Sequence, residues 1–384
     1  MQKNPMRIAL LGYGTVGGGV YEFVQARSDM EMAYVLDLRP CPDVTCKVTK
    51  NFEEICADAS VDTVVETMGG LHPAYEYVTA SLKAGKNVVT ANKLLIAAHY
   101  RELVELAKAN GAALRCTAAA GGGIPWLTNI ERALKQEQLI SVSGIMNGTT
   151  NFMLDTMHTS GGSFDDALAE AQRLGYAEAD PSADLNGGDI RRKIVISANV
   201  AFGCVVEEKD VDVWGIENLR AEDISACKKM NRVCKLIATA SKPGSTVSAY
   251  IEPTFVPMSM LEAAVPDNNN LISLTGKYIG KQSFYGQGAG RYPTAYNVVQ
   301  DCLDIVNGKK SFYTDKLEPA TVDNSGILRR YYVRTDSMDK WLQTNVDKLL
   351  DHAIITKEVS VSEIHAWARA RKQIDPTCFI ASIV

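Results

Sequence analysis

The fold is decided by the stretch Arg7-Ile8-Ala9-Leu10-Leu11-Gly12-Tyr13-Gly14-Thr15-Val16-Gly17, near the start of the 384-residue chain. Residues 7–11 predict a short apolar strand, and a helical pattern follows over Val16–Arg27. The three glycines between them allow a tight turn and let a pyrophosphate approach the helix N-terminus, where free N–H groups and the helix dipole favour an anion. A G-x-G-x-x-G string is weak by itself, and a plain strand-to-helix turn is the alternative. Because it joins a strand to a helix here, we favour dinucleotide binding.

Strand and helix patterns alternate beyond this loop. Strands are predicted at Met32–Asp37, Val61–Glu66, Asn87–Thr90 and Ala112–Cys116, and helices at Pro73–Ala84 and Ala98–Asn110. Such alternation is typical of a parallel sheet covered by helices on both faces. We therefore predict a Rossmann-type, doubly wound dinucleotide-binding domain over residues 1–137.

An acidic residue at the end of the second strand bears on the choice of coenzyme. Asp37 is placed to accept hydrogen bonds from an adenosine ribose diol, which favours NAD. Arg39 is close enough to accommodate the 2′-phosphate of NADP instead. NAD is the preferred expectation, and NADP stays open.

The pattern changes after residue 137. For residues 138–292 we predict an α+β substrate and dimerisation domain with a largely antiparallel sheet. Its predicted strands are Leu139–Met146, Thr246–Pro257, Leu271–Tyr278 and Gln282–Tyr285, and its helices are Phe164–Leu174, Asp189–Phe202 and Ala221–Ala240. Residues 293–312, with a helix at Pro293–Val306, are expected to pack back on the first domain.

The last part of the chain, residues 314–384, is predicted to form a small C-terminal α+β module. Its expected elements, in order, are a strand at Arg329–Arg334, a helix at Met338–Asp351, a strand at Ala353–Ser360, a helix at Val361–Lys372 and a strand at Phe379–Val384. The sequence assigns this module no function.

Composition excludes several classes of protein. The net charge is −5 with no basic block, which argues against a nucleic-acid partner. No apolar run is long enough to span a membrane, and the first residues lack the apolar region typical of a signal peptide. The nine cysteines are scattered, as is typical of reduced thiols in a cytoplasmic protein. Cys116 ends a predicted strand, but no histidine lies near it in sequence, so a buried thiol is preferred to a nucleophile that attacks an aldehyde.

Two motifs carry candidate ligand-binding groups. The segment Asn147-Gly148-Thr149-Thr150-Asn151 follows a half-buried strand and offers short polar groups beside a glycine, although it could also be an ordinary Asn-Gly turn. Lys93 follows a parallel strand at its carboxyl end, where ligands collect in doubly wound sheets. A solvated surface lysine is the alternative.

A dense acidic group precedes a predicted buried helix. Glu178, Asp180, Asp184 and Asp189 are followed by Arg191, Arg192 and Lys193. Asp189 and Lys193 are spaced for an i,i+4 ion pair, which on a solvated helix would contribute about 0.3–0.5 kcal/mol. Residues 194–202 are almost entirely apolar, so the helix is buried, and charges at its start need a partner or a function. We favour a function.

Together these motifs resemble the homoserine dehydrogenase family over roughly residues 6–310. The matching segments are Gly12-x-Gly14-x-x-Gly17, Met68-Gly69-Gly70, Val88–Lys93, Gly121-Gly122-Gly123-Ile124-Pro125, Asn147–Asn151, Gly175–Lys193, and Gly286-Gln287-Gly288-Ala289-Gly290 with Pro293-Thr294-Ala295. The resemblance implies the NAD(P)-dependent interconversion of L-aspartate 4-semialdehyde and L-homoserine, on the route to threonine, methionine and isoleucine. It also implies a homodimer.

The resemblance assigns roles by motif position. Lys193 corresponds to the catalytic lysine and Lys93 to a second active-site lysine, while Glu178, Asp184 and Asp189 match the family's substrate-site carboxylates. Substrate-binding positions are Glu178, Asp184, Gly148, Thr149 and Tyr176. Cofactor-binding positions are Gly12, Gly14, Thr15, Val16, Gly17, Asp37, Gly69, Lys93 and Gly288.

The chain departs from the family pattern in three places. The carbonyls of Ala120, Gly122 and Ile124 correspond to ligands of a monovalent cation, Na⁺, but Thr117 stands where the family has a glutamate, which argues against that site. Leu36 stands before Asp37 where NADP-using members often have arginine, which favours NAD. The C-terminal module is short for the ACT regulatory domain that many bacterial members carry.

The sequence predicts that a nicotinamide ring delivers hydride to an aldehyde carbon. Lys193 would stabilise the charge on the carbonyl oxygen and donate the proton, with Asp189 one turn earlier. Glu178 and Asp184 would hold the substrate ammonium. Two rival hypotheses remain: another NAD(P)-linked oxidoreductase of a related semialdehyde or imine, and a catalytically silent dinucleotide-binding regulator.

Overall fold

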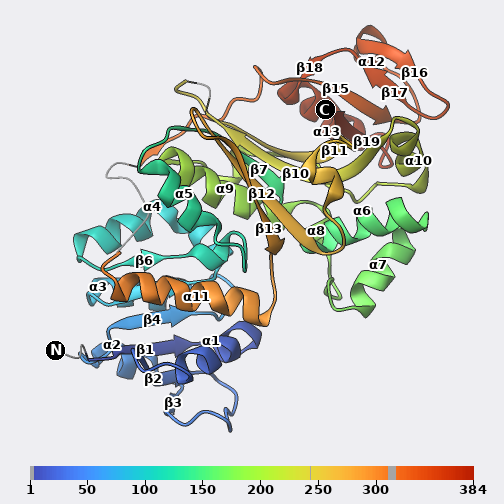
Figure 1. The fold of residues 1–384 in the computed structure, drawn as a ribbon. Coiled ribbons are helices and arrows are strands. Elements are labelled where there is room, and N and C mark those ends of the chain that lie inside the picture. Colours follow the sequence, from blue (N-terminus) through green and yellow to red (C-terminus); the bar gives the residue numbers. More distant parts are fainter. Residues whose placement is uncertain (1–3, 243, 310–316) are drawn as a thin grey trace. The chain divides into compact units, whose positions relative to one another are not determined.

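The computed structural model describes residues 4–242, 244–309 and 317–384, and these form two compact units. The first unit contains the described residues up to Gln136, Asn199–Val205, and those from Gly286 to Glu318. The second contains Glu137–Ala198, the described residues from Val206 to Tyr285, and Pro319–Val384. Each unit is described by itself below (Figure 1).

A six-stranded parallel sheet organises the first unit, in the order β3-β2-β1-β4-β5-β6. Its strands are β1 (Met6–Leu11), β2 (Met30–Leu36), β3 (Lys47–Thr49), β4 (Thr63–Glu66), β5 (Asn87–Thr90) and β6 (Leu114–Arg115). The chain leaves β1 toward β2 and β3 and later returns to the other side of β1 with β4. In such sheets ligands bind at the carboxyl ends of the strands, where the strand order reverses. The predicted doubly wound parallel sheet is confirmed.

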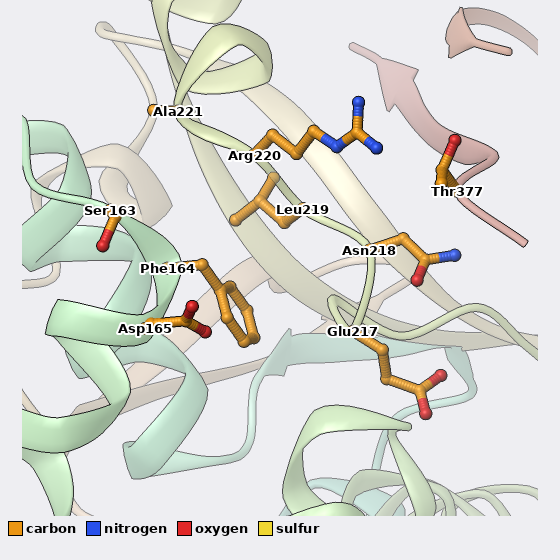
Figure 2. Close-up of a pocket in the computed structure, with 9 residues that line it drawn as sticks. All are labelled: Ser163, Phe164, Asp165, Glu217, Asn218, Leu219, Arg220, Ala221 and Thr377. Atoms are coloured by element: carbon orange, nitrogen blue, oxygen red, sulfur yellow. The ribbon is translucent and has the colours of Figure 1, made fainter. Parts of the chain in front are cut away.

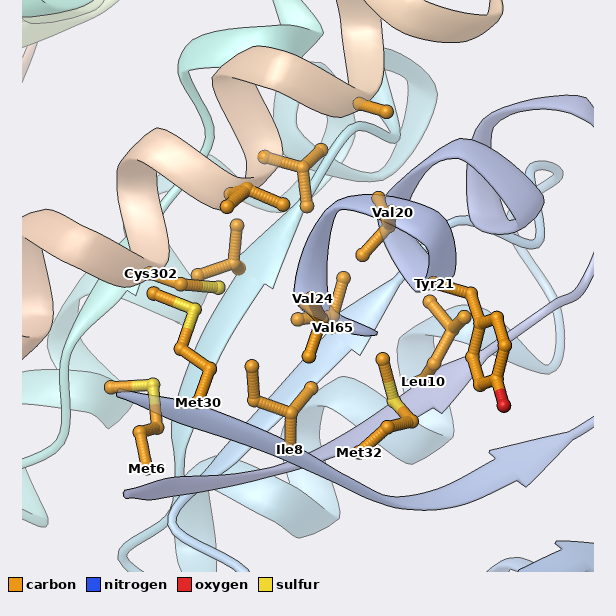
Figure 3. Packing of buried hydrophobic residues seen from close by; sticks show 14 of the residues in the cluster. Met6, Ile8, Leu10, Val20, Tyr21, Val24, Met30, Met32, Val65 and Cys302 are labelled. Atoms are coloured by element: carbon orange, nitrogen blue, oxygen red, sulfur yellow. The ribbon is translucent and has the colours of Figure 1, made fainter. Parts of the chain in front are cut away.

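Helices and a buried apolar cluster complete the first unit. The helices are α1 (Thr15–Gln25), α2 (Phe52–Ala57), α3 (Ala74–Lys83), α4 (Lys93–Ala109), α5 (Trp126–Leu134) and α11 (Arg291–Val306), with a 3₁₀ turn η1 (Thr117–Ala119). Figure 3 shows how α11, from late in the chain, contributes Cys302 to the cluster formed by β1, β2 and α1. Gly19 of α1 lies so near α11 that an added Cβ would come within 2.9 Å of the Ala295 Cβ.

Helix α4 begins at Lys93, five residues before the predicted start at Ala98. Asn92 caps it, since its side-chain oxygen accepts a hydrogen bond from the Leu95 N–H at 3.1 Å. A residue with non-helical angles, His99, interrupts the helix and obscures its periodicity in the sequence.

A mixed sheet of 11 strands organises the second unit, in the order β13-β12-β7-β10-β11-β19-β15-β17-β16, with β18 on β15 and β9 on β11. The strands are β7 (Leu139–Ile145), β9 (Asp212–Val213), β10 (Arg232–Ser241), β11 (Ser248–Pro257), β12 (Asn269–Gly276), β13 (Gly280–Gln287), β15 (Leu328–Arg334), β16 (Val346–Leu349), β17 (Ile354–Thr356), β18 (Val359–Ser360) and β19 (Phe379–Ile383). The pairs β7–β10, β7–β12 and β10–β11 are antiparallel, as predicted, whereas β11 pairs with β9 and β19 in parallel. A separate two-stranded sheet joins β8 (Cys204–Val205) and β14 (Glu318–Pro319).

The helices that accompany this sheet are α6 (Gly148–Ser160), α7 (Phe164–Arg173), α8 (Ser182–Leu185), α9 (Gly188–Phe202), α10 (Ala221–Lys229), α12 (Lys340–Asn345) and α13 (Val361–Lys372), with 3₁₀ turns η2 (Glu208–Asp210) and η3 (Leu261–Ala264). The last residues of α9 belong to the first unit.

The helix predicted over Ala221–Ala240 is wrong in its second half. Helix α10 ends at Lys229, and Asn231 turns the chain with a left-handed φ of 54°. The following residues form β10, which lies between β7 and β11 in the sheet. The sequence of this segment suits a helix or a strand, and only its pairing partners decide that it is a strand.

The helix predicted over Met338–Asp351 is also wrong in its second half. Helix α12 ends at Asn345, and β16 follows at once because it pairs with β17. The strand predicted over Ala353–Ser360 divides into β17 and β18, both of which pair with β15.

The C-terminal strands extend the sheet of the second unit. β19 pairs with β11, with Thr254 opposite Ser382 and Phe255 opposite Ile383. The division into a domain over 138–292 and a module over 314–384 stays a prediction, and its boundary near residue 313 lies outside the described residues.

Candidate active site

The glycine-rich loop of the first unit has the geometry that an anion site requires. Gly12 has a φ of +91°, and a Cβ on Gly17 would lie 2.0 Å from the Gly12 carbonyl oxygen, so both glycines are required by the turn itself. A Cβ on Gly14 would meet only the Arg39 Nη2, at 4.0 Å. Gly14 precedes α1, and no side chain caps that helix. The N–H groups of its first turn, which include those of Thr15 and Val16, are therefore suited to bind a phosphate.

Asp37 is placed by this loop and by Arg39. Its carboxylate accepts hydrogen bonds from the backbone N–H of Tyr13 at 2.7 Å and of Arg39 at 2.9 Å. The Arg39 guanidinium donates to both carboxylate oxygens, at 3.1 and 3.0 Å. These hydrogen bonds, the one from the Arg39 side chain first, hold the pKa of Asp37 well below its usual range. A carboxylate and an exposed guanidinium thus lie together at the end of β2.

A buried carboxylate that sequence reasoning missed connects the ends of β4 and β5. Glu66 is fully buried and accepts hydrogen bonds from the N–H groups of Met68 at 2.8 Å and Gly69 at 3.3 Å. Its other oxygen accepts from the Thr90 hydroxyl at 2.5 Å. Burial raises the pKa of Glu66. A glutamate at the end of an apolar strand was the available signal, because a carboxylate there needs partners.

The same network fixes the start of α4, where Lys93 lies. Asn92 donates its side-chain amide to the Gly70 carbonyl at 2.6 Å, and its backbone N–H to the Thr90 hydroxyl at 2.9 Å. Lys93 is the first residue of the helix and is half-buried. Glu66, through Thr90 and Asn92, therefore positions both the Gly69 turn and Lys93.

The segments predicted to surround a cation also lie in the first unit. Thr117, Ala120 and Ile124 are buried, and the Gly122 backbone packs against Gly288, whose oxygen would lie 2.3 Å from a Cβ on Gly122. Among the described residues, no group of three or more His, Cys, Asp or Glu side chains is arranged to hold a metal ion.

In the second unit, Asn147 does not form an isolated turn but caps a helix. Its side-chain oxygen accepts a hydrogen bond from the Thr150 N–H at 2.8 Å, so Gly148 and Thr149 are the first residues of α6. The sequence reading missed this helix because its start consists of glycine, two threonines and asparagine, which have low helix propensity. Its end is marked by Gly161, with a φ of 74°.

Asn147 also joins the acidic group to the lysine. Its side-chain N–H group donates to Asp184 at 2.6 Å and to Asp189 at 3.0 Å. Lys193 forms the predicted ion pair with Asp189 at 2.8 Å, with both side chains only 9% exposed, and it donates to the Met146 carbonyl at 2.7 Å. The lysine thus lies against the carboxyl end of β7, away from bulk water.

The two carboxylates of this cluster lie close to each other. Burial raises the pKa of Asp184, and so does the negative charge of Asp189. Lys193 forms an ion pair with Asp189. Buried carboxylates of this kind are groups that recognise a substrate ammonium.

The remaining predicted substrate residues differ in position. Thr149 donates its hydroxyl to the Tyr176 carbonyl at 2.6 Å, and the Tyr176 ring packs edge-on against Phe152. Glu178 is exposed, and among the described residues its carboxylate makes no hydrogen bond or ion pair with the cluster. The structure therefore brings together Asp184, Asp189 and Lys193, and it joins Thr149, on α6, to Tyr176, which follows α7.

A buried lysine that was not predicted from the sequence contacts α6. The Lys235 ammonium, fully buried on β10, donates to the Asn151 side chain at 2.9 Å and to the Val265 carbonyl at 2.6 Å. Asn151 in turn donates to the carbonyls of Asp267 and Asn269 at 2.7 and 3.2 Å. Burial lowers the pKa of Lys235 to about 8. The last residue of the Asn147–Asn151 motif is therefore a structural anchor.

The cysteines agree with the sequence reading. All nine are free, and Cys116 is buried, which raises the pKa of its thiol. A buried thiol whose pKa is raised is a poor nucleophile.

The surface of the second unit also has an open groove with a volume of about 430 Å³. Figure 2 shows its lining, which includes Phe164, Leu219, Arg220 and Thr377. None of the residues predicted to bind substrate lines it.

Among the described residues, no helix is both long enough and apolar enough to cross a membrane.

Comparison with known proteins agrees with this geometry. The family model of the homoserine dehydrogenase NAD-binding domain matches residues 12–117, and the family model of homoserine dehydrogenase matches residues 125–303. The chain is 34% identical over 359 residues to homoserine dehydrogenase of Bacillus subtilis, covering 87% of this chain and 82% of that protein. It is 41% identical over 321 residues to the enzyme of Corynebacterium glutamicum, covering 79% and 72%.

A solved structure shares the whole architecture. The crystal structure of a homoserine dehydrogenase from Thiobacillus denitrificans superimposes with a TM-score of 0.87 at 28% identity, covering 99% of this chain and 98% of that chain. The glycine-rich loop, the parallel sheet and the Asp184–Asp189–Lys193 cluster lie within the matched regions. This chain belongs to the homoserine dehydrogenase family.

Proposed function

We propose that this chain catalyses the reaction of its family, the reversible NAD(P)-dependent reduction of L-aspartate 4-semialdehyde to L-homoserine, with Lys193 as the proton donor. The observation that carries this proposal is the position of the Lys193 ammonium, buried between Asp189 and the Met146 carbonyl. A buried ammonium held by a carboxylate is suited to stabilise a developing alkoxide.

NAD(P), when bound, supplies the hydride that reaches the aldehyde carbon. The glycine-rich loop fits the cofactor for two reasons. The protein itself leaves open space beside Gly14, so the absence of a side chain there leaves room for a ligand. The first turn of α1 lacks a side-chain cap, so its N–H groups can bind a phosphate. Gly12, Gly17 and Gly69 shape the turns around it, and Gly288 packs against Gly122.

The residues of the second unit account for the proton. As the carbonyl becomes an alcohol, its oxygen gains negative charge, which the Lys193 ammonium stabilises and then neutralises by donating a proton from Nζ. Asp189 and the Met146 carbonyl orient Nζ throughout. In the reverse direction the neutral amine of Lys193 accepts the hydroxyl proton. Lys93, at the start of α4, is proposed to orient the substrate or relay the proton.

The amino-acid end of the substrate is assigned to the acidic group. Asp184 binds the α-ammonium, because its carboxylate is largely buried and Asn147 fixes its orientation. Gly148 and Thr149 border this position on α6, with Tyr176 bound to Thr149. Glu178 is proposed as a second carboxylate for the ammonium, and its exposed side chain is free to turn toward substrate.

NAD is the proposed coenzyme, with NADP as the alternative. The ionised carboxylate of Asp37 accepts hydrogen bonds from a ribose diol and repels a 2′-phosphate. Arg39, which is bound to Asp37 and exposed, is the residue that would favour NADP. A homodimer and a cytoplasmic location are further parts of the proposal, the second supported by nine free cysteines.

Spectrophotometry at 340 nm with L-homoserine, run separately with NAD and NADP, tests the reaction. Homoserine should be oxidised faster than related hydroxy acids and amino alcohols, and Lys193→Ala should lower kcat by about 10²–10⁴-fold. NADH binding, followed by fluorescence, should be nearly unchanged in that variant. Near-normal turnover of Lys193→Ala would contradict the assignment. The absence of NADH formation with every substrate would instead favour a silent regulator.

A further inference from the structure

The turn that follows η1 in the first unit is closely packed and ends in buried carbonyls. Gly121 and Gly122 have φ angles of 119° and 57°, and the Gly123 N–H donates to the Gln287 carbonyl at 3.0 Å. The carbonyls of Gly122 and Ile124 point toward α11. These are two of the carbonyls that the family resemblance assigns to a monovalent cation.

A side-chain amide from α11 already satisfies both carbonyls. Asn297 is fully buried, and its Nδ2 donates to the Gly122 oxygen at 2.6 Å and to the Ile124 oxygen at 3.0 Å. Both hydrogens of the amide are thus used at once. They place partial positive charge at the carbonyl oxygens, where a cation would otherwise be attracted.

The residue that would supply a carboxylate is also committed elsewhere. Thr117 donates its hydroxyl to Asp301 at 2.7 Å and its backbone N–H to the other oxygen of Asp301 at 2.8 Å. The Arg115 guanidinium donates to Asp301 as well, at 3.1 Å. The one carboxylate in contact with Thr117, among the described residues, is therefore occupied by three donors.

We propose that the side-chain amide of Asn297 takes the place of a monovalent cation at this turn, and that the enzyme works without one. Its two N–H groups hold the carbonyls of Gly122 and Ile124 together, which is the structural task a bound cation would perform. The donor set does not fit a cation, because hard cations require oxygen ligands with available lone pairs and favour a carboxylate among them.

The orientation of the amide is what the experiment must test. The Asn297 Oδ1 is buried and has no hydrogen-bond partner among the described residues. If the amide were reversed, Oδ1 would face two carbonyl oxygens, and three oxygens arranged in this way would attract a cation. A requirement for sodium or potassium would therefore reveal the reversed arrangement.

The test compares the full-length protein in choline chloride, NaCl and KCl at equal ionic strength. Thermal unfolding is the main measurement, and the rate of homoserine oxidation is the second. We expect the same Tm and nearly the same rate in all three salts. A cation present at about 100 times its Kd would raise Tm by several degrees, and such a rise with Na⁺ or K⁺ alone would overturn the proposal.

A matched pair of variants sharpens the test. Asn297→Asp replaces the two donors by a carboxylate facing the same carbonyls, so this variant should gain a Tm that rises with Na⁺ or K⁺. Asn307→Asp, at the exposed end of the same helix, should have a Tm that is the same in all three salts, as in the wild type. An Asn297→Asp protein with no salt-specific response would contradict the proposal. If Asn297→Asp does not fold, the wild-type melts decide alone.

The inference rests on the proposed function only for the rate measurement. If no salt supports homoserine oxidation, the proposed function fails, while the melts still show whether the turn binds a cation.

Discussion

Lys235 is a buried cation whose ionisation should be visible in the stability of the protein. Its pKa falls from 10.5 to about 8 because burial disfavours the charged form. Below pH 8 both folded and unfolded chains hold this proton. Between pH 8 and 10.5 the unfolded chain binds more protons than the folded one, so the contribution of this residue to the free energy of unfolding increases with pH.

The size of the effect follows from the shift. One pKa unit is worth about 1.4 kcal/mol, so the full shift corresponds to about 3 kcal/mol, of which about 2.5 kcal/mol develops between pH 7 and pH 10. Lys235→Met removes the titrating group, leaves the Asn151 side-chain oxygen without its donor and takes one of two donors from the Val265 carbonyl. The free energy of unfolding of the wild type minus that of Lys235→Met should therefore grow by about 2–3 kcal/mol over this range.

Urea unfolding followed by tryptophan fluorescence measures this difference. Three of the four tryptophans, Trp214, Trp341 and Trp367, lie in the second unit with Lys235. Taking the difference at each pH cancels the titration of the other lysines and tyrosines. Lys228→Met, an exposed lysine on α10, serves as control and should show a constant difference. A difference between wild type and Lys235→Met that stays constant from pH 7 to pH 10 would refute the reasoning.

Three further predictions concern the site. Asp37→Ser removes the negative charge that opposes a 2′-phosphate and releases Arg39 from its ion pair. The kcat/KM for NADP, divided by the kcat/KM for NAD, should therefore rise by about tenfold or more. If this ratio is unchanged, Asp37 does not select the coenzyme. Glu66→Ala leaves the Met68 and Gly69 N–H groups without an acceptor, at a cost of about 1–3 kcal/mol each. This variant should bind NADH more weakly in a fluorescence titration, whereas Glu66→Gln should recover most of the affinity. Equal affinities of the wild type and both variants would exclude a positioning role for Glu66. Asn147→Ala removes the cap of α6, worth about 1 kcal/mol, and the donor shared by Asp184 and Asp189. Its KM for homoserine should rise more than its kcat falls, and steady-state kinetics with an unchanged KM would contradict this.

The sequence was sufficient to predict the features that depend only on residues close together in the chain. Residues 7–17 predict a strand, a glycine turn and a helix, and these form as β1, the loop and α1 because each depends on neighbours a few residues away. The ion pair of Asp189 and Lys193 follows from one helical turn of spacing. The alternation of strands and helices up to residue 116 predicts the parallel sheet for the same reason.

Where structure depends on distant partners, the sequence was ambiguous. Residues 232–241 are apolar enough for a helix or a strand, and β7 and β11 on either side decide for a strand. Asn147 caps α6 but also reaches Asp184 and Asp189, about 40 residues later, which no local pattern indicates.

The sequence by itself determined the class of fold, the presence of a dinucleotide loop and the ion pair of Asp189 and Lys193, because these follow from residue type and short-range periodicity. Only the tertiary structure decided how buried polar groups are satisfied. Glu66 is matched by Thr90, Lys235 by Asn151, and the Gly122 carbonyl by Asn297. Each buried group must find a partner, and which partner it finds depends on how the folded chain brings distant segments together.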